Sequence, residues 1–326
     1  MKGFSDRWTD FPDYIIGITK EIWEDRGVAA LRHYYSEDIP VRSPMGMKRG
    51  NAQVMASTMA TIHEFPDREL LGEDVIWSEH ETGLLSSHRL LTRATHTQDG
   101  AFGPATGKHW VVRVIADCAA RADTIFDEWL VRDYGGMVRQ LGLDPRDYAG
   151  HLIDREGGAS RATRPFTPEV DVPGDYRGVG NDNAWGLRYE TLLSRIMDKD
   201  FAVIHSDYDR AVIGEYAGAT TAIGRDAVTR FWIGLRSAFP NAEFRIHHRI
   251  GMDGGMMSPR AAIRWSLDGL HEGWGAFGAP TGARAHVMGI SHAEFGPFGP
   301  GGIGLRREFT LYDEVAIWKQ ILLATR

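Results

Sequence analysis

The chain contains one spaced pattern of residues twice. An arginine is followed seven positions later by a histidine, then by Gly-Ala-Phe-Gly and, two residues further on, by Thr-Gly. The first copy starts at Arg89 and includes His96, and the second starts at Arg264 and includes His271, so every member is displaced by 175 positions. This displacement is far longer than the roughly 20–50 residues of solenoid repeats. The sequence therefore predicts two similar domains, each with its own core.

The duplication extends beyond this pattern and sets the predicted domain boundaries. At a displacement of 174 positions, Tyr34 matches Tyr208, Gly50 matches Gly224, and Phe-Pro at 65–66 matches Phe-Pro at 239–240. Between the two copies the apolar periodicity disappears and prolines and glycines accumulate, which is typical of a linker. We expect a first domain at 1–143, a linker at 144–186 and a second domain at 187–326.

The composition is that of a soluble globular protein and excludes several classes of partner. Hydrophobic residues make up 43% and charged residues 25% of the chain, so a core can form. The formal net charge is −7 and no dense run of lysine and arginine occurs, which argues against nucleic acid and anionic membranes as partners. The single cysteine, Cys118, cannot form an internal disulfide, and the N-terminus lacks the pattern of a signal peptide. We therefore expect a cytoplasmic protein.

Each copy is expected to begin with helices and to continue with strands. Apolar residues recur at helical spacing over 15–35 and 51–62, and again over 189–208 and 228–235. Asn51 and Asp226 are predicted to cap the second helix of each copy. Segments rich in β-branched and aromatic residues then predict strands at 84–97, 110–119 and 124–132, and at 260–270, 286–295 and 305–312.

The last predicted strand of the first copy is apolar on both faces. Trp129 and Val131 point to one side, whereas Phe126 and Leu130 point to the other. A sheet of this kind needs a cover on each side. We expect helices and a pocket on one face and the sheet of the other copy on the opposite face, so that the domains form an internal pseudo-dimer.

Several segments resemble the SnoaL-like polyketide cyclase family of the nuclear-transport-factor-2-like superfamily. They are Arg-Leu-Leu-Thr-Arg-Ala-Thr-His at 89–96, Phe-Gly-Pro-Ala-Thr-Gly at 102–107 and Asp-Glu-Trp-Leu-Val-Arg-Asp at 127–133, with a second set at 264–271 and 279–282. The resemblance implies an α+β fold: two tandem cone-shaped barrels, each a curved mixed sheet wrapped on helices around an apolar pocket. The superfamily includes cyclases, isomerases, dehydratases, epoxide hydrolases and binding proteins, so it does not define the chemistry. In the family the last strand often reads His-Trp-Asp, whereas Leu130 and Thr310 occupy the position of that acid here.

The residues that recur in both copies are candidates for catalysis, and each also has a structural interpretation. His96 and His271 begin the glycine-rich turns and are suited to general acid/base chemistry, or they fasten the turns by hydrogen bonds. Arg89 and Arg264 bind an anionic group of a substrate or form buried ion pairs. Asp133 and Asp313 follow the last strands and act as bases or cap the next helices.

The strongest candidates lie where the two copies differ. Asp117 in the first copy corresponds to His292 in the second, 175 positions later. His109 and Arg113 share strand parity with Asp117, and His88 shares parity with His96. An ionisable row on an apolar sheet is unexpected in a plain core, because a buried charge is costly unless it is paired. We predict that Asp117 abstracts a proton next to a carbonyl group while a histidine donates to the developing oxyanion; the alternative is that these are polar residues at a surface edge.

A matching set is predicted for the second copy. It consists of His271, His286, His292 and Glu308, with Trp265 and Trp274 as pocket walls and Trp129 as a wall in the first copy. No phosphate-loop, paired-cysteine, zinc-protease or dinucleotide motif is present, and no histidine spacing is diagnostic of a metal. We therefore expect no cofactor and no metal.

Two functions follow from these residues. The first is a cofactor-independent general acid/base enzyme, of cyclase, isomerase, lyase or hydratase type, that acts on a small and largely apolar metabolite. The alternative is a non-catalytic protein that binds a small molecule, in which one or both copies lack chemistry. Homodimerisation beyond the internal pair is left open.

Overall fold

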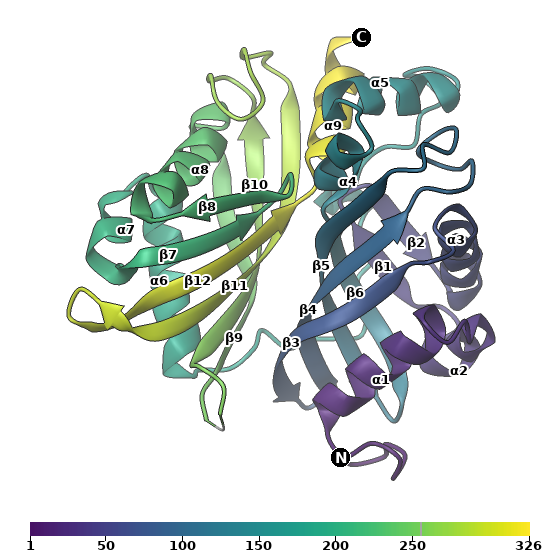
Figure 1. The fold of residues 1–326 in the computed structure, drawn as a ribbon, viewed down its shortest axis with the longest axis horizontal. Helices are drawn as coiled ribbons and strands as arrows, with labels where there is room; N and C mark the ends of the chain where they lie inside the picture. Colours follow the sequence, from purple (N-terminus) through teal and green to yellow (C-terminus); the bar gives the residue numbers. More distant parts are fainter. Residues whose placement is uncertain (255) are drawn as a thin grey trace.

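The computed structural model describes residues 1–254 and 256–326 and contains two α+β domains side by side (Figure 1). The first domain begins with helix α1 (Phe11–Trp23), the short elements η1 (Val28–Ala30) and α2 (Leu31–Tyr34), strands β1 (Pro40–Ser43) and β2 (Gly46–Arg49), and helix α3 (Asn51–Glu64). It continues with β3 (Glu69–His80), β4 (Gly83–Thr95), β5 (His109–Arg121), β6 (Thr124–Arg132), α4 (Tyr134–Gln140) and α5 (Pro145–Arg155).

The second domain repeats this order after the 3-10 turn η2 (Pro168–Val170). It contains α6 (Ala184–Met197), α7 (Ala202–Asp207), β7 (Tyr208–Tyr216), β8 (Thr220–Ile223) and α8 (Arg225–Ala238). The strands β9 (Glu243–Met252), β10 (Arg260–Leu270), β11 (Arg284–Gly299) and β12 (Gly302–Tyr312) follow, and α9 (Glu314–Thr325) ends the chain.

Both sheets are mixed and have the same strand order. The first runs β2-β1-β6-β5-β4-β3 and the second runs β8-β7-β12-β11-β10-β9. In each sheet one pair is parallel, β1 with β6 and β7 with β12, and the other neighbours are antiparallel. The expected fold class, two tandem α+β domains with curved mixed sheets, is confirmed.

The predicted helices at 15–35 and 189–208 are each interrupted in the structure. Helix α1 ends at Trp23, and Arg26 adopts a left-handed backbone conformation with φ 60° before the chain turns into η1. In the second copy Lys199, with φ 71°, separates α6 from α7. A left-handed residue cannot continue a right-handed helix, so the single long helices predicted from apolar spacing were wrong.

The predicted helix caps Asn51 and Asp226 were also wrong. Helices α3 and α8 begin after Gly50 and Gly224, whose φ angles of +87° and +80° favour glycine. Asn51 is the first helical residue, and its side-chain amide donates a hydrogen bond to the carbonyl of Tyr35.

The three strands predicted in each copy are present, and β1, β2, β3, β7, β8 and β9 are additional. The strand β3 has no clean alternation because its pairing with β4 shifts register between Gly72 and Asp74. The strands β1, β2 and β8 have only four residues each, too few for a periodic pattern.

Each sheet carries helices on one face and the other domain on its opposite face (Figure 1). Helices α1, α2 and α3 lie on the outer side of the first sheet, and α6, α7 and α8 lie on the outer side of the second. Two apolar clusters join the inner faces. One includes Ile115, Val131, Ile290 and Phe309, and the other includes Ile76, Leu85, Ile250 and Ala262.

Ion pairs surround these apolar clusters. The Arg264 guanidinium lies 3.3 Å from the Asp117 carboxylate and 3.6 Å from the centroid of the Trp129 ring. Arg89 reaches across to Glu294 at 3.0 Å, and Arg260 reaches back to Asp74 at 3.0 Å. The charges between the sheets are therefore paired across the interface, which reduces the cost of burying them.

The segment predicted to be the linker contributes to this interface. Its first part forms α5, which packs against the C-terminal helix α9. Its later part inserts Phe166 and Tyr176 into the two apolar clusters. The phenol of Tyr176 also lies 3.0 Å from Nε2 of His248 in the second domain. The domain boundaries at 143/144 and 186/187 stay a prediction.

The buried pair between Asp117 and Arg264 supplies a test of the interface. We expect Asp117→Asn and Arg264→Met each to lower the free energy of unfolding by about 3–5 kcal/mol, because each leaves one buried charge without its partner. The double variant should lose less than the sum of the two by about 0.5–3 kcal/mol. Urea denaturation of the four proteins measures this coupling, and strictly additive losses would contradict the pairing.

Candidate functional site

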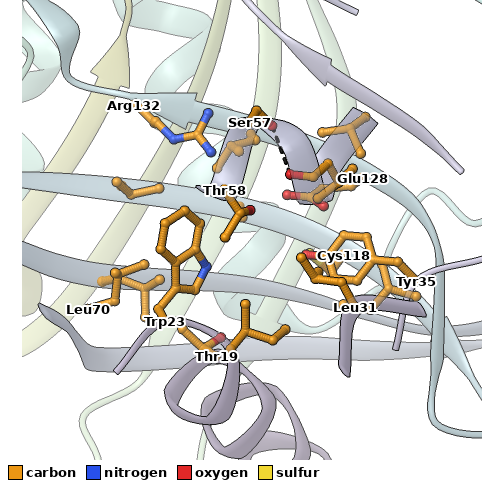
Figure 2. A pocket seen from close by; sticks show the side chains of 18 of the residues that line it. Thr19, Trp23, Leu31, Tyr35, Ser57, Thr58, Leu70, Cys118, Glu128 and Arg132 are labelled. Atoms are coloured by element: carbon orange, nitrogen blue, oxygen red, sulfur yellow. Dashed lines mark hydrogen bonds between the residues drawn. The ribbon is translucent and has the colours of Figure 1, made fainter. Parts of the chain in front are cut away.

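The first domain encloses a cavity between its helices and the inner curve of its sheet (Figure 2). The cavity has a volume of about 110 Å³. Its apolar wall comes from α1, α2 and the central strands and comprises Ile15, Ile18, Ile22, Trp23, Leu31, Leu70, Leu90, Val114 and Ala116. A cavity of this size suits a ligand smaller than benzene, because benzene occupies a larger apolar cavity of about 150 Å³.

Strand β6 contributes two charged side chains to this cavity. Glu128, Leu130 and Arg132 alternate along the strand and all line the cavity, whereas Trp129 and Val131 face the second domain. Figure 2 shows the side chains of Glu128 and Arg132 extending toward the same space from different sides. Their α-carbons are separated by about 13 Å, since a strand rises about 3.3 Å per residue.

Glu128 has the environment of a general base. The residue is 5% exposed, and burial raises the pKa of its carboxyl, an effect that Arg132, the hydroxyl of Tyr35 and Lys48 oppose in that order. Burial and the charge of Glu128 raise the pKa of Tyr35 well above its usual value, so the phenol beside the carboxylate stays protonated. A carboxylate whose pKa is raised is a stronger base than a free one.

Three cations line the same cavity. Arg68 is 3% exposed, and burial together with the nearby Arg132 lowers its pKa to about 9, which still leaves it protonated at pH 7. Its Nε donates to Thr92 Oγ1 at 3.1 Å, and its guanidinium lies 4.9 Å from the centroid of the Trp23 ring. Lys48 is exposed as a whole, yet burial of its ammonium end and the charge of Arg132 lower its pKa to about 8.

His88 lines the cavity from strand β4. Its Nδ1 lies 3.1 Å from the hydroxyl of Ser86, and burial lowers the pKa of the imidazole to about 4. The ring is therefore neutral at pH 7 and contributes hydrogen bonding without charge.

The second domain carries a glutamate at the same place but binds it differently. Glu308 lies on β12 opposite Gly214 of β7, just as Glu128 lies on β6 opposite Val41 of β1. Its carboxylate accepts four hydrogen bonds, from the hydroxyls of Tyr189, Tyr208 and Tyr216 and from the indole of Trp232, at 2.6–3.0 Å. Four donors saturate a carboxylate, so Glu308 has no lone pair left for a ligand.

Aromatic side chains occupy the interior of the second domain. Thr58 of the first copy corresponds to Trp232 and Ser57 to Phe231, both displaced by 174 positions. The strand registers place Tyr216 where the first copy has Ser43. The rings of Tyr216 and Phe231 are stacked with centroids 3.7 Å apart, and Trp232 is fully buried beside them.

One complementary exchange shows how this interior is packed. Leu90 and Val114 of the first copy correspond to Trp265 and Gly289 of the second, both displaced by 175 positions. A Cβ atom on Gly289 would lie 2.2 Å from the Trp265 ring, so only glycine leaves room for the indole. The indole nitrogen of Trp265 donates to Ser291 Oγ at 2.9 Å.

Comparison with known families identifies the second copy. Residues 189–296 match the family described as SnoaL-like domain. This match lies within the second copy and covers about a third of the chain, so that copy is similar to the SnoaL-like family. The first domain repeats its strand order and its parallel pair, as the internal duplication predicts. A search of curated proteins finds no match.

Solved structures of this kind resemble the chain at low identity. IdmH of Streptomyces antibioticus, described as a candidate polyketide cyclase, is 22% identical to this chain. The match covers 40% of this chain and 98% of IdmH, with a TM-score of 0.36. A candidate SnoaL-like polyketide cyclase of Jannaschia is 13% identical, with 43% covering 96% at 0.35. AclR of Streptomyces galilaeus, titled as a candidate hydroxylase, is 16% identical, with 40% covering 92% at 0.34. The family assignment rests on residues 189–296.

The predicted histidines of the glycine-rich turns are buried and fasten those turns. Nδ1 of His96 lies 3.2 Å from Thr106 Oγ1, and Nδ1 of His271 lies 3.1 Å from Thr281 Oγ1. Nε2 of His96 is 3.2 Å from the Glu64 carboxylate. Neither histidine lines the cavity of the first domain.

The predicted ionisable row lies between the two sheets. Asp117 pairs with Arg264, and Arg113 pairs with Glu73 and Glu215. His292 lies 2.8 Å from the Ser87 hydroxyl through Nε2 and 3.3 Å from Arg89 Nη1 through Nδ1. Because arginine only donates, Nδ1 accepts and the Nε2–H donates to serine, and burial lowers the pKa of this imidazole well below its usual value.

Asp133 and Asp313 cap the helices that follow them. Asp133 accepts from the backbone N–H of Gly136 and also from Gly218 and Ala219 of the second domain. Asp313 accepts from the backbone N–H of Val315 and Ala316. Burial raises the pKa of Asp133 to about 6 and that of Asp313 to about 8.

The remaining predicted residues are dispersed. His109 and Trp274 are exposed, and Trp274 is 73% exposed. His286 pairs with Asp268 at 3.3 Å, and Trp129 lies between the guanidinium groups of Arg42 and Arg264. Of all the predicted site residues, only His88 lines the cavity of the first domain. Whether any of the others takes part in a reaction stays a prediction.

The cavity residues that the sequence prediction missed are Glu128, Arg132, Lys48, Arg68 and Tyr35. Strand parity would have found the first two, because Glu128 and Arg132 share a face with Leu130. Comparison of the copies would have found Lys48 and Arg68, since Ala222 and Ala242 stand 174 positions later. Within the described residues, no three His, Cys, Asp or Glu side chains are grouped so that they could hold a metal ion. No described helix is both long and apolar enough to cross a membrane.

The two glutamates should respond differently to the same substitution. We expect Glu308→Gln to lower the free energy of unfolding by about 2–5 kcal/mol, because an amide group would face two buried donors and leave them without acceptors. Glu128→Gln should change stability by less than about 1 kcal/mol, since it removes a charge that burial already disfavours. Urea denaturation of both variants measures the difference, and equal losses would contradict the contrast between the two interiors.

The raised pKa of Asp313 predicts a pH dependence of stability. Between about pH 4 and pH 8 the folded state binds a proton at Asp313 that the unfolded state has lost, so this contribution to stability falls as pH rises. Asp313→Asn keeps the cap and removes the titration. We expect its melting temperature, measured at pH 5, 6, 7 and 8, to decline by a few degrees less than that of the wild type. Parallel curves would contradict the assignment.

Proposed function

We propose that the first domain is the catalytic half of a general acid/base enzyme, of cyclase, isomerase, lyase or hydratase type, and that it acts on a small carbonyl compound. The observation that carries this proposal is the contrast between Glu128 and Glu308. Both occupy the same position in the fold, but one borders a cavity and the other is saturated by four donors. A carboxylate with free lone pairs in a largely apolar cavity is equipped to accept a proton.

The proposed step is proton abstraction from a carbon next to a carbonyl group. The Glu128 carboxylate takes the proton, and the electron pair of the C–H bond moves to the carbonyl oxygen to form an enolate. The protonated Tyr35 hydroxyl, which influences Glu128, would donate to this oxygen and stabilise its negative charge. If the enolate is conjugated with a C=C bond, Glu128 returns the proton at the far carbon of that system. Alternatively, the enolate carbon attacks the carbon of a second carbonyl group of the substrate, whose C=O π electrons move to its oxygen, and Glu128 gives the proton to that alkoxide.

The helices supply the apolar part of the site. Ile18 and Ile22 of α1 are 2% and 3% exposed, and Leu31 begins α2 beside them. Trp23 offers a flat aromatic surface. This lining favours a substrate with an apolar body and excludes bulk water, which strengthens the electrostatic effects of the charged residues. The reaction needs no cofactor in this scheme.

In this proposal the second domain contributes structure rather than chemistry. Its interior is filled by aromatic rings, and its sheet covers the sheet of the first domain. The two domains then act as an internal pseudo-dimer, and a cytoplasmic location stays a prediction. The alternative function is a small-molecule binding protein without turnover, which the small volume of the cavity favours.

Hydrogen–deuterium exchange separates enzyme from binder. In D2O we expect the wild-type protein to accelerate the loss of the α-proton signals of acetone or 2-butanone above the rate in buffer, as measured by proton NMR. Glu128→Gln should reduce the protein-dependent rate about 10²–10⁴-fold, the usual contribution of a positioned acid or base.

Glu79→Gln is the matched control, because Glu79 is an exposed glutamate on strand β3, at the edge of the same sheet. It should retain the wild-type rate. Thermal stabilisation by these ketones without exchange would support the binding protein. Exchange that is equal in wild type and Glu128→Gln would exclude Glu128 as the base.

A further inference from the structure

The charge of the first-domain cavity is unbalanced. Arg68, Arg132 and Lys48 face it, whereas Glu128 is the only carboxylate among its lining residues. No ion pair to Arg68, Arg132 or Lys48 is present in the described part of the chain, and Arg68 donates from its side chain only to the neutral hydroxyl of Thr92. The two arginines also repel each other, as the lowered pKa of Arg68 reflects.

Because Arg68 is buried, the lack of a counter-charge beside it costs folding free energy. Arg68 is 3% exposed, so its charge is almost entirely removed from water. Its contacts with the faces of Trp23 and Trp110, at 4.9 and 5.7 Å, offset part of that cost but provide no hydrogen-bond acceptor for its terminal nitrogens. A buried cation without a counter-charge is strongly destabilising. Among the other buried arginines, Arg42, Arg89, Arg260 and Arg264 each have a carboxylate partner. Arg236 donates instead to the backbone carbonyls of Pro240 and Ala242. Among the described residues, the terminal nitrogens of Arg68 have neither kind of acceptor.

The second domain carries none of these charges. The residues that correspond to Arg68, Lys48 and Arg132 are Ala242, Ala222 and Tyr312, by the displacement of the copies and the strand registers. The cations are therefore not required by the fold. They are present in the first domain, which has the cavity, and absent from the second domain, whose interior is filled by aromatic rings.

We infer that the first-domain cavity binds a small organic carboxylate, with the carboxylate group on Arg68 and Arg132 and the apolar body against Trp23 and the helix side chains. Arginine binds carboxylates through paired N–H donors, which gives both affinity and orientation. The inference rests on the proposed ligand site and narrows its substrate to a keto acid or a related carboxylate. Glu128 and Arg132 lie at opposite ends of the segment 128–132 of β6. The proton that Glu128 takes therefore belongs to a carbon of the ligand that is several bonds from the ligand's carboxylate group.

The ligand's size follows from the cavity. A volume of about 110 Å³ admits only a compact molecule smaller than benzene, given that an apolar cavity of about 150 Å³ accommodates benzene. Propionate and propionamide have nearly the same shape and differ in charge, so they form a matched pair of probes. The tryptophan at the wall, Trp23, provides a fluorescence signal for binding.

The test is a fluorescence titration of the full-length protein with each probe, repeated by calorimetry. We expect the wild type to bind propionate at least about tenfold more tightly than propionamide. Arg132→Gln should abolish this preference. The side chain of Arg132 has no hydrogen-bond partner among the described residues, so the variant should fold. Arg68→Met should have the same effect, with its melting temperature as a check on folding.

Arg93→Gln is the control, because Arg93 is an exposed arginine on β4 that pairs with Glu69 outside the cavity. It should bind both probes as the wild type does. Equal affinities for propionate and propionamide, or a preference that survives in Arg132→Gln, would overturn the inference. If that occurs while Glu128-dependent exchange of the ketones persists, the anion site is wrong and the proposed function stands.

Discussion

Both faces of each curved sheet must be covered, and the chain meets this requirement by placing the two sheets against each other. The apolar clusters between them take residues from both domains and from the linker, including Phe166 and Tyr176. Charges that fall on these faces, such as Asp117 and Arg264, are paired across the interface. Because this contact covers the face of each sheet that lies toward the other domain, the opposite, concave face of each sheet is left to its own helices.

The two concave sides are packed in opposite ways on one scaffold. A glutamate stands at the same strand position in both, yet the Glu308 carboxylate is enclosed by three phenols and an indole, while Glu128 borders a cavity with unpaired cations. A small number of residue replacements between the copies produces this difference, and a larger side chain at one position is accompanied by a smaller one beside it. Trp265 and Gly289 are such a pair, because only glycine at 289 leaves room for the indole. Duplication lets one domain keep a packed core that supports the other, so the hollow domain does not have to provide all the stability.

Much of the fold follows from the sequence, because the duplication, the long strands and the two-sided apolar pattern are all visible in it. The site does not, since strand parity assigns residues to a face but does not say which face the partner domain covers. Asp117 and His292 share a face with Trp129, and that face is the interface. Arg68 lies in the turn before β3, where no periodicity applies, and its burial depends on the distant Trp23 and Trp110. The broken helices follow from single left-handed residues that apolar spacing does not detect.

A high-resolution crystal structure that shows ordered solvent tests the central claim most directly. The account predicts ordered water or a bound anion in the first domain within hydrogen-bonding distance of Arg68 and Glu128, because buried charged groups with free donors and acceptors hold solvent. It predicts that no water reaches Glu308, whose four protein donors should be in place. Side chains that close the first cavity, or solvent beside a Glu308 released by its tyrosines, would contradict it.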